Sequence, residues 1–369
     1  MRRLPDGLMR RALPVILAAG ALAGAVQSQA VAQQPPPVAA PKKFYWDKRP
    51  DQCFQPGAAE SAMCAAEPNW PDYRQTVGRV TNLFVEPDFD LIQRAEDELG
   101  YSRQKFPTGE YYFEAWYFSL ENNFSFFPSN YRRKTASDWA KSKGSDGYVK
   151  LVEAMLHYAE AWLARGRGQA NTVAPEAWDL YNEKLDQALR DLDSASPKLK
   201  QTGPWHDVKL RIMFQGANYR NMRLEAFKSA IDAWPDYATI YVTAMKYNLP
   251  RWGGSFELVE GIARFAAEKN GPELGAAVYA IAYERLLRGD GEYTLRDSQA
   301  DWDLMKRGFR VLEDKGGAQV SLWKNFAKFA CDMRDRDEAR RLYAVSDRVM
   351  PPTGTEAPDP CRRFAMSSE

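Results

Sequence analysis

The amino-acid sequence predicts an all-α protein, an α-solenoid of stacked helix pairs behind a loop-rich N-terminal cap. Beyond Pro71, apolar residues recur at spacings of three and four, as they do on one face of a helix, and strand-like alternation is nearly absent. About 300 residues would strain one compact core, but they suit a stack in which each helix pair contacts its neighbours. We expect the helical repeat domain to span residues 72–350.

Residues 1–32 have the pattern of a secretory signal peptide. Four arginines precede an apolar run from Ala12 to Val26, and Ala30-Val31-Ala32 forms a cleavage site of small residues. The run is about fifteen residues long, whereas a helix that spans a bilayer needs about twenty. We expect a periplasmic or secreted protein whose mature chain does not insert into a membrane.

Residues 33–43 and 44–71 are expected to form two non-helical segments. The first is rich in Gln, Pro, Ala and Val, with three consecutive prolines, and this composition predicts a disordered leader. The second holds two cysteines and several prolines. We expect it to be a cap stapled by its own disulfide.

Two segments show the helical pattern most clearly. From Val149 to Leu163 one face is apolar and the other is polar. A second helix is expected to begin at Pro175 and Glu176. Proline suits the first turn because the N–H groups there have no partner within the helix, and glutamate suits it because this end of the helix dipole is positive. Its apolar face comprises Trp178, Tyr181, Leu185, Ala188, Leu189 and Leu192. The glycines expected at C-caps and turns are Gly166, Gly168, Gly253, Gly254, Gly316 and Gly317.

The last third of the chain is similar to a tetratricopeptide unit, in which two helices are closed by a proline. Such a unit places small residues where its helices cross and large aromatic residues between neighbouring pairs. The matching residues are Trp323, Phe326, Ala327, Ala330, Ala339, Tyr343 and Pro351. A weaker copy ends with Phe227, Ala230 and Pro235, and has Arg223 where alanine is usual. A proline-rich tail, residues 351–369, follows the last unit.

Further residues match the pattern of a bacterial helical family. They are Trp162, Arg165-Gly166-Arg167-Gly168, Val173, Trp178, Leu185, Phe227, Ala230, Pro235, Tyr237, Tyr241 and the segment from Leu249 to Ser255. On this pattern residues 75–290 resemble the family catalogued as domain of unknown function 4034. The resemblance implies a tetratricopeptide-like helical fold and supplies no activity, cofactor or catalytic residue.

The segment from Leu249 to Ser255 has two interpretations. In the structural one, Pro250 ends a helix, two glycines permit positive φ in a tight turn, and Ser255 caps the next helix. Trp252 then packs under the turn. In the other, successive backbone N–H groups bind a carboxylate or phosphate. The residues of that anion site are Arg251, Gly253, Gly254 and Ser255.

The densest aromatic stretch runs from residue 111 to residue 127. Phe113, Trp116 and Tyr117 fall on one helical face, and such faces are usually buried in a core. The alternative is an exposed groove in which Trp116 contacts a glycan or peptide. The carboxylates nearby that could act as the acid and base of a glycosidase are Glu110, Glu114 and Glu121.

The four cysteines are an even number in a chain expected to be exported, which predicts disulfides rather than catalysis or metal binding. Sequence neighbourhood favours Cys53 with Cys64 and Cys331 with Cys361, the second pair pinning the tail onto the last helical unit. A bridge between the two ends of the chain, or free buried thiols, are the alternatives.

Charge and histidine content restrict the function further. Without the four arginines and Asp6 of the signal peptide, 46 basic and 48 acidic residues remain, a net charge of about −2. We therefore expect no nucleic-acid partner, and we also expect no metal and no cofactor. A Ser-His-Asp triad would have to use His157 or His206, because these are the two histidines, and no Gly-x-Ser-x-Gly sequence occurs.

The leading hypothesis is a non-enzymatic interaction module of the cell envelope that presents a repeat face or groove to a protein or peptide. The alternative is a cell-wall or glycan-active hydrolase with a carboxylate pair near Glu114. The hydrolase requires two carboxylates about 5 to 9.5 Å apart, whereas the interaction module requires an exposed apolar patch.

Overall fold

The structure is a computed structural model of the 369-residue chain. It describes residues 70, 72–125, 129–166, 168–315, 320–349 and 359–367, without the side chains of residues 290, 320, 321 and 349. The chain divides into two units, Met1–Asn69 and Trp70–Glu369, and all described residues belong to the second. The expected signal peptide, the leader and all of the cap except Trp70 lie outside the described residues, and so do Cys53, Cys64, Gly316, Gly317 and Pro351.

The described residues form sixteen α-helices and no strand beyond one isolated bridge between Lys105 and Tyr111, which confirms the all-α prediction. A π-helix, Glu96–Gly100, follows the second helix. The α-helices are α1 (Tyr73–Leu83), α2 (Phe89–Ala95), α3 (Tyr112–Phe124), α4 (Asn130–Lys143), α5 (Tyr148–Arg165), α6 (Pro175–Ser194), α7 (Pro197–Lys200), α8 (Gly203–Gln215), α9 (Arg223–Ala233), α10 (Ala238–Tyr247), α11 (Phe256–Lys269), α12 (Gly271–Asp290), α13 (Trp302–Asp314), α14 (Val320–Asp332), α15 (Arg336–Val349) and α16 (Pro360–Met366).

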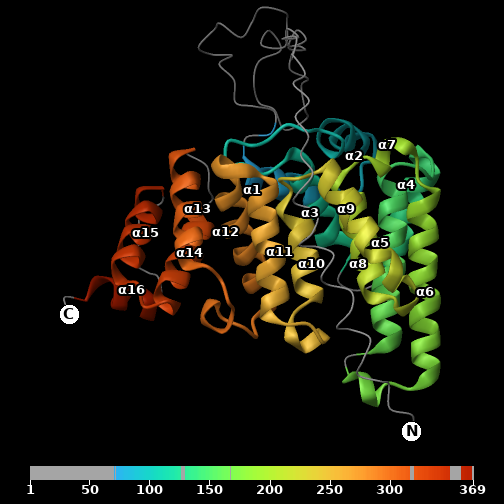
Figure 1. Ribbon diagram of the computed structural model, residues 1–369. Helices are drawn as coiled ribbons and strands as arrows, with labels where there is room; N and C mark the ends of the chain where they lie inside the picture. Colours follow the sequence, from blue (N-terminus) through green and yellow to red (C-terminus); the bar gives the residue numbers. More distant parts are fainter. Residues whose placement is uncertain are drawn as a thin grey trace, which may run out of the picture. The chain divides into compact units, whose positions relative to one another are not determined.

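Most helices pack against helices that lie near them in the sequence (Figure 1). Extensive contacts join α5 to α6, α11 to α12, α12 to α13 and α14 to α15. One close crossing depends on a glycine: a Cβ on Gly308 in α13 would lie 2.2 Å from the carbonyl oxygen of Ala276 in α12. The absence of a side chain at Gly308 therefore lets α12 and α13 approach closely.

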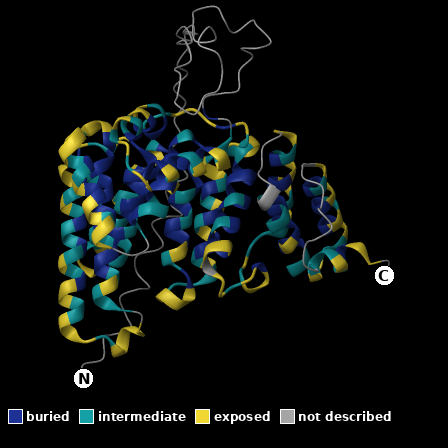
Figure 2. Cartoon of the chain, turned by 180° about the vertical axis from the view of Figure 1, so that it is seen from behind, coloured by how far each residue is buried: buried dark blue, intermediate teal, exposed yellow. Residues whose placement is uncertain are grey.

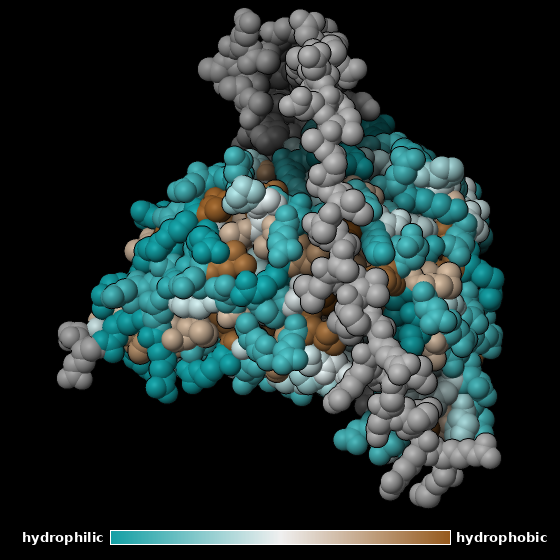
Figure 3. Space-filling view, in the orientation of Figure 1, coloured by the Kyte–Doolittle hydropathy of each residue, from teal (hydrophilic) through white to brown (hydrophobic). Residues whose placement is uncertain are grey.

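The core runs along the inner faces of these helices, and exposed residues gather on their outer turns and at their ends (Figure 2). The two helices predicted most clearly are confirmed. Helix α5 ends at Arg165, with Gly166 at φ +74° as its cap, and α6 has Pro175 in its first turn. On the view in Figure 3 the surface is mainly hydrophilic, with hydrophobic side chains in scattered groups. Within the described ranges, no helix has both the length and the apolar character needed to cross a bilayer.

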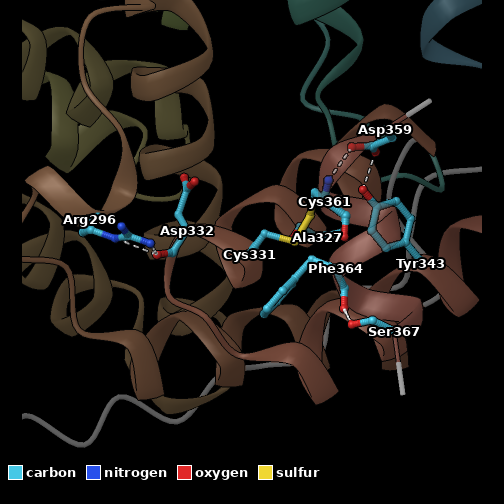
Figure 4. The surroundings of a disulfide bond; sticks show 9 residues. All are labelled: Arg296, Ala327, Cys331, Asp332, Tyr343, Asp359, Cys361, Phe364 and Ser367. Carbon is cyan, nitrogen blue, oxygen red and sulfur yellow. Dashed lines mark hydrogen bonds between the residues drawn. A yellow bond between two sulfur atoms is a disulfide. The ribbon is translucent and has the colours of Figure 1, made fainter. Parts of the chain in front are cut away.

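The predicted last unit is the helix pair α14 and α15, and its small and aromatic residues are buried. These are Trp323, Phe326, Ala327, Ala330, Ala339 and Tyr343. The predicted Cys331–Cys361 disulfide is present, with 5.8 Å between the Cα atoms, and it ties α16 to α14 (Figure 4). The prediction of a proline-rich tail missed α16, a short helix capped by the Asp359 side chain, which accepts a hydrogen bond from the Cys361 N–H.

Candidate functional site

Aromatic rings from five parts of the chain meet around the segment from Leu249 to Ser255. The Trp252 ring lies 6.4 Å from the Trp162 ring of α5 and 6.4 Å from the Tyr247 ring of α10, measured between centroids. The contacts continue from Trp162 to Tyr181 and from Tyr181 to Trp178, both on α6, and from Tyr247 to Phe214 of α8. We call these six residues the ring cluster: Trp162, Trp178, Tyr181, Phe214, Tyr247 and Trp252.

The six residues of the ring cluster differ in how far they are buried. Tyr181 is buried, and its hydroxyl donates to Gln215 Oε1 at 3.0 Å. Trp162, Trp178, Phe214 and Tyr247 are half-buried, while Trp252 is 41% exposed. The prediction that Trp252 packs under the turn is therefore wrong. Its ring touches the other rings at an edge and leaves much of its surface to solvent.

Two arginines connect the ring cluster to helix ends. The Arg165 guanidinium lies 5.2 Å from the Trp162 ring and 5.2 Å from the Trp178 ring, and it donates to the carbonyl oxygens of Gly166 and Gly168. Arg165 therefore caps the C-terminal end of α5, where a cation is favoured by the helix dipole.

Arg223 has the same role at the end of α8. Its guanidinium donates to the Met213 carbonyl oxygen at 2.8 Å and to that of Gly216 at 3.1 Å, beside the Phe214 ring. Burial, and then the nearby Arg220, lower the pKa of Arg223. The departure from alanine at this position of the weaker repeat thus supplies a cap that an alanine could not provide.

The turn that carries Trp252 requires its two glycines for different reasons. Gly253 has φ +85°, which a residue with a Cβ rarely adopts. Gly254 does not have positive φ, but a Cβ there would lie 2.0 Å from the carbonyl oxygen of Asn248. The prediction of positive φ is therefore right for Gly253 and wrong for Gly254. Ser255 caps α11 as predicted, since its side chain accepts a hydrogen bond from the Leu258 N–H.

The interpretation of this turn as an anion site does not fit its contacts. The Gly253 N–H donates to the Pro250 carbonyl oxygen at 2.9 Å, and the Gly254 N–H donates to that of Leu249 at 3.2 Å. Arg251 forms an ion pair with Glu292 at 2.9 Å. Two of the three N–H groups therefore stabilise the turn itself, and the guanidinium already has a carboxylate.

Trp116 does not belong to an exposed groove. It is 0% exposed and its ring contacts those of Phe84, Trp139 and Tyr148. The core interpretation is therefore correct and the binding interpretation is wrong. Helix α3 buries most of its aromatic face between other helices, and Phe118, 45% exposed, points outward instead.

The carboxylates near the aromatic stretch hold helices together. Glu114 Oε1 accepts a hydrogen bond from the Tyr111 N–H at 3.0 Å, and Glu114 Oε2 forms an ion pair with Arg285 of α12 at 2.9 Å. Glu121 forms an ion pair with Arg211 of α8. Burial raises the pKa of Glu110. Because both Glu114 oxygens are engaged, this residue does not supply the free acid or base of the proposed hydrolase.

Two polar pairs lie on contacts that the sequence does not reveal. His157 Nδ1 of α5 lies 2.7 Å from Asp191 Oδ2 of α6. Glu96, at the start of the π-helix, is buried and accepts a hydrogen bond from the Tyr101 hydroxyl at 2.8 Å. The π-helix that begins at Glu96 is visible only in the structure. It draws attention to Glu96, because π-helices are rare and often mark functional positions.

In the described part of the chain, no group of three or more His, Cys, Asp or Glu side chains is arranged to hold a metal ion. No family model, curated protein or solved structure matches this chain. The resemblance to domain of unknown function 4034 therefore stays a prediction, and the case for a function depends on the ring cluster.

Proposed function

We propose that this chain is an exported helical-repeat protein, an α-solenoid of the cell envelope, that binds a protein or peptide through the ring cluster. The observation that carries the proposal is the position of Trp252. It is 41% exposed and stands at the outer edge of a connected set of buried and half-buried rings. Trp, Tyr and Arg are the residues most enriched among those that dominate binding energy at protein interfaces.

The turn around Trp252 favours binding because it is already ordered. Gly253 and Gly254 directly follow a short 3-10 helix, Pro250–Trp252, and their two N–H groups donate within the turn. A partner that covers the ring therefore pays little conformational entropy to order it. Covering the exposed part of the Trp252 side chain then adds hydrophobic free energy to binding, in proportion to the area removed from water.

The cellular location rests on separate features. The signal-peptide pattern precedes Ala32 in the sequence, and the Cys331–Cys361 disulfide is typical of an oxidising compartment. A stack of helix pairs then provides a rigid support for the exposed turn. These features support the periplasm or the exterior as the place where the partner is met.

A peptide-display selection against the chain from Gln33 onward tests this function. The selected peptide is synthesised, and its dissociation constant is measured with the parent protein, Trp252→Ala and Phe118→Ala. Phe118 is a matched control because it is an aromatic residue of similar exposure on α3, outside the ring cluster. We expect Trp252→Ala to weaken binding by at least about tenfold and Phe118→Ala to leave it unchanged. Equal affinities of all three proteins would refute the proposal.

A further inference from the structure

Arginine side chains border the ring cluster on several sides. Three guanidinium groups lie close to a ring of the cluster: Arg165 at 5.2 Å from Trp162, Arg251 at 5.6 Å from Trp252, and Arg223 at 5.6 Å from Phe214. A fourth arginine, Arg220, is exposed, and its charge acts on Arg223. We call these four residues the arginine rim: Arg165, Arg220, Arg223 and Arg251.

Arg223 carries a positive charge that no carboxylate of the described residues offsets. Burial lowers the pKa of Arg223, and the nearby Arg220 lowers it further. The Nε and Nη2 groups of Arg223 donate to the carbonyl oxygens of Met213 and Gly216, which leaves Nη1 for a further acceptor. Carbonyl oxygens satisfy these donors but carry no full charge, so they do not neutralise the guanidinium.

Two other arginines within the fold do have carboxylates beside them. Arg211 forms an ion pair with Asp207 at 2.7 Å, and Arg285 forms one with Glu114 at 2.9 Å. Burial alone would lower the pKa of both guanidinium groups, but these carboxylates raise it instead. Arg223, which lies against the ring cluster, differs from both because its charge has no such complement in the described chain.

The other arginines of the rim differ in the same way. Arg251 is paired with Glu292, whereas Arg165 donates to backbone carbonyl oxygens. Within the described ranges, Arg165, Arg220 and Arg223 form no ion pair. The complement that these three cations lack is therefore a carboxylate, and a partner could supply it.

The exposed Trp252 ring is close enough to the rim for one short peptide to reach both. Trp252 touches the rings of Trp162 and Tyr247, and the guanidinium groups of Arg165 and Arg223 lie beyond these rings. Each step between neighbouring groups is 5 to 7 Å, and an extended peptide covers about 3.3 Å per residue. A peptide of roughly six residues therefore spans the distance from Trp252 to either end of the rim.

We propose that the peptide bound by the ring cluster is acidic: an apolar side chain covers Trp252, and Asp or Glu carboxylates bind Arg165, Arg220 and Arg223. This inference rests on the proposed function and specifies the chemistry of the partner. A guanidinium binds a carboxylate through charge-assisted and often bidentate hydrogen bonds, so these contacts fix the position of the peptide along the cluster. The same charges accelerate association at low salt.

The peptide from the display selection is the probe, together with a version in which every Asp is replaced by Asn and every Glu by Gln. Fluorescence anisotropy gives the dissociation constants of both peptides with the chain from Gln33 onward. We expect the selected peptide to be rich in acidic residues, and the amide version to bind at least about tenfold more weakly in about 50 mM sodium chloride. The difference should shrink in about 500 mM, because salt screens the charges.

Two arginine variants locate the effect on the rim. Arg220→Gln should keep the parent melting temperature because its side chain is exposed, and it should weaken binding of the acidic peptide by at least about threefold. Arg223→Gln also removes the cap of α8, so the comparison of the two peptides separates charge from stability: the difference in their affinities should narrow. Arg307→Gln, on an exposed arginine of α13, is the matched control and should bind both peptides as the parent does.

The outcomes distinguish this inference from the proposed function. A peptide whose binding depends on Trp252 but is unaffected by the amide replacement overturns the acidic partner and leaves the proposed function intact. The same holds if neither Arg220→Gln nor Arg223→Gln narrows the difference between the two peptides. Binding that does not depend on Trp252 overturns both.

Discussion

The Trp252 ring meets the Trp162 ring nearly edge to face, with an interplanar angle of 68°. The two residues are 90 positions apart in the chain, yet both belong to the segments that distinguish this sequence most clearly. Trp162 is half-buried at the junction of α5 and α6, whereas Trp252 is 41% exposed. The Trp162 ring therefore supports the ring cluster from inside the protein, and the Trp252 ring forms its exposed edge.

This division of roles predicts different stabilities for two alanine variants. Trp162→Ala removes a ring packed against Tyr181 and under the Arg165 guanidinium, and it should cost about 3 kcal/mol of unfolding free energy. Trp252→Ala should cost less than about 1 kcal/mol because its ring is exposed. Urea unfolding of the two variants measures both values. A larger loss for Trp252→Ala would show that Trp252 is a structural residue.

The two glycines of the turn should also differ. In Gly254→Ala the new Cβ meets the backbone oxygen of Asn248, which cannot move without breaking the turn, so we expect a loss of at least about 2 kcal/mol. In Gly253→Ala only the unfavourable φ is added, which costs about 1 kcal/mol. Thermal unfolding of both variants tests this order, and the reverse order would mean that the turn has a different backbone.

Glu96 should make the protein less stable as the pH rises. Burial raises the pKa of Glu96 from 4.5 to about 7, although its hydrogen bonds with Tyr101 and with the Tyr148 N–H act in the opposite direction. The folded state holds the Glu96 proton more tightly than the unfolded state does. The contribution of this proton to the free energy of unfolding is therefore fully present below pH 4.5 and is lost between pH 4.5 and about 7. The loss amounts to about 3 kcal/mol at most.

The variant Glu96→Gln isolates this effect, because the amide keeps an acceptor for Tyr101 but does not ionise. We expect it to unfold at a higher urea concentration than the parent at pH 8 and at a similar concentration at pH 4. Asp97→Asn, on an exposed neighbouring side chain, serves as the control. An equal pH dependence in the parent protein and Glu96→Gln would exclude Glu96 as the source.

The disulfide between α14 and α16 should stabilise the C-terminal end. It closes a loop with a sequence separation of 30, for which chain entropy predicts about 3 to 4 kcal/mol. The double variant Cys331→Ser with Cys361→Ser removes this bridge and leaves the other cysteines intact. We expect a lower melting temperature and faster proteolysis of α16, followed by mass spectrometry. An unchanged melting temperature would indicate that α16 packs stably without the bridge.

Sequence reasoning succeeds here where the signal is local. The first turn at Pro175, the Ser255 cap and the glycine after Arg165 each depend on residues within one helical turn, so their patterns are visible in the chain. The burial of Trp323 follows from the repeat spacing in the same way. Local patterns thus predict the all-α class, several of the helices and part of the core.

The candidate site could be predicted only in part, because it depends on contacts between distant helices. The ring cluster joins Trp162 to Trp252, and no local pattern shows that they meet or which ring faces solvent. Glu114 forms an ion pair with Arg285, a residue 171 positions later in the chain. The sequence alone does not show this contact, so Glu114 could be excluded as a catalytic acid or base only from the structure. Asp191 orients His157 from another helix, which the two sequence positions alone do not indicate.

The most direct test of the account is a photo-cross-link from the turn itself. A benzoyl-phenylalanine is placed at position 252 or at position 118, and each protein is irradiated with the peptide obtained by display selection. We predict a one-to-one cross-linked product at position 252 that unlabelled peptide suppresses, and none at position 118. A peptide that binds both proteins but cross-links only at position 118, or at neither, would contradict the claim that the ring cluster is the binding surface.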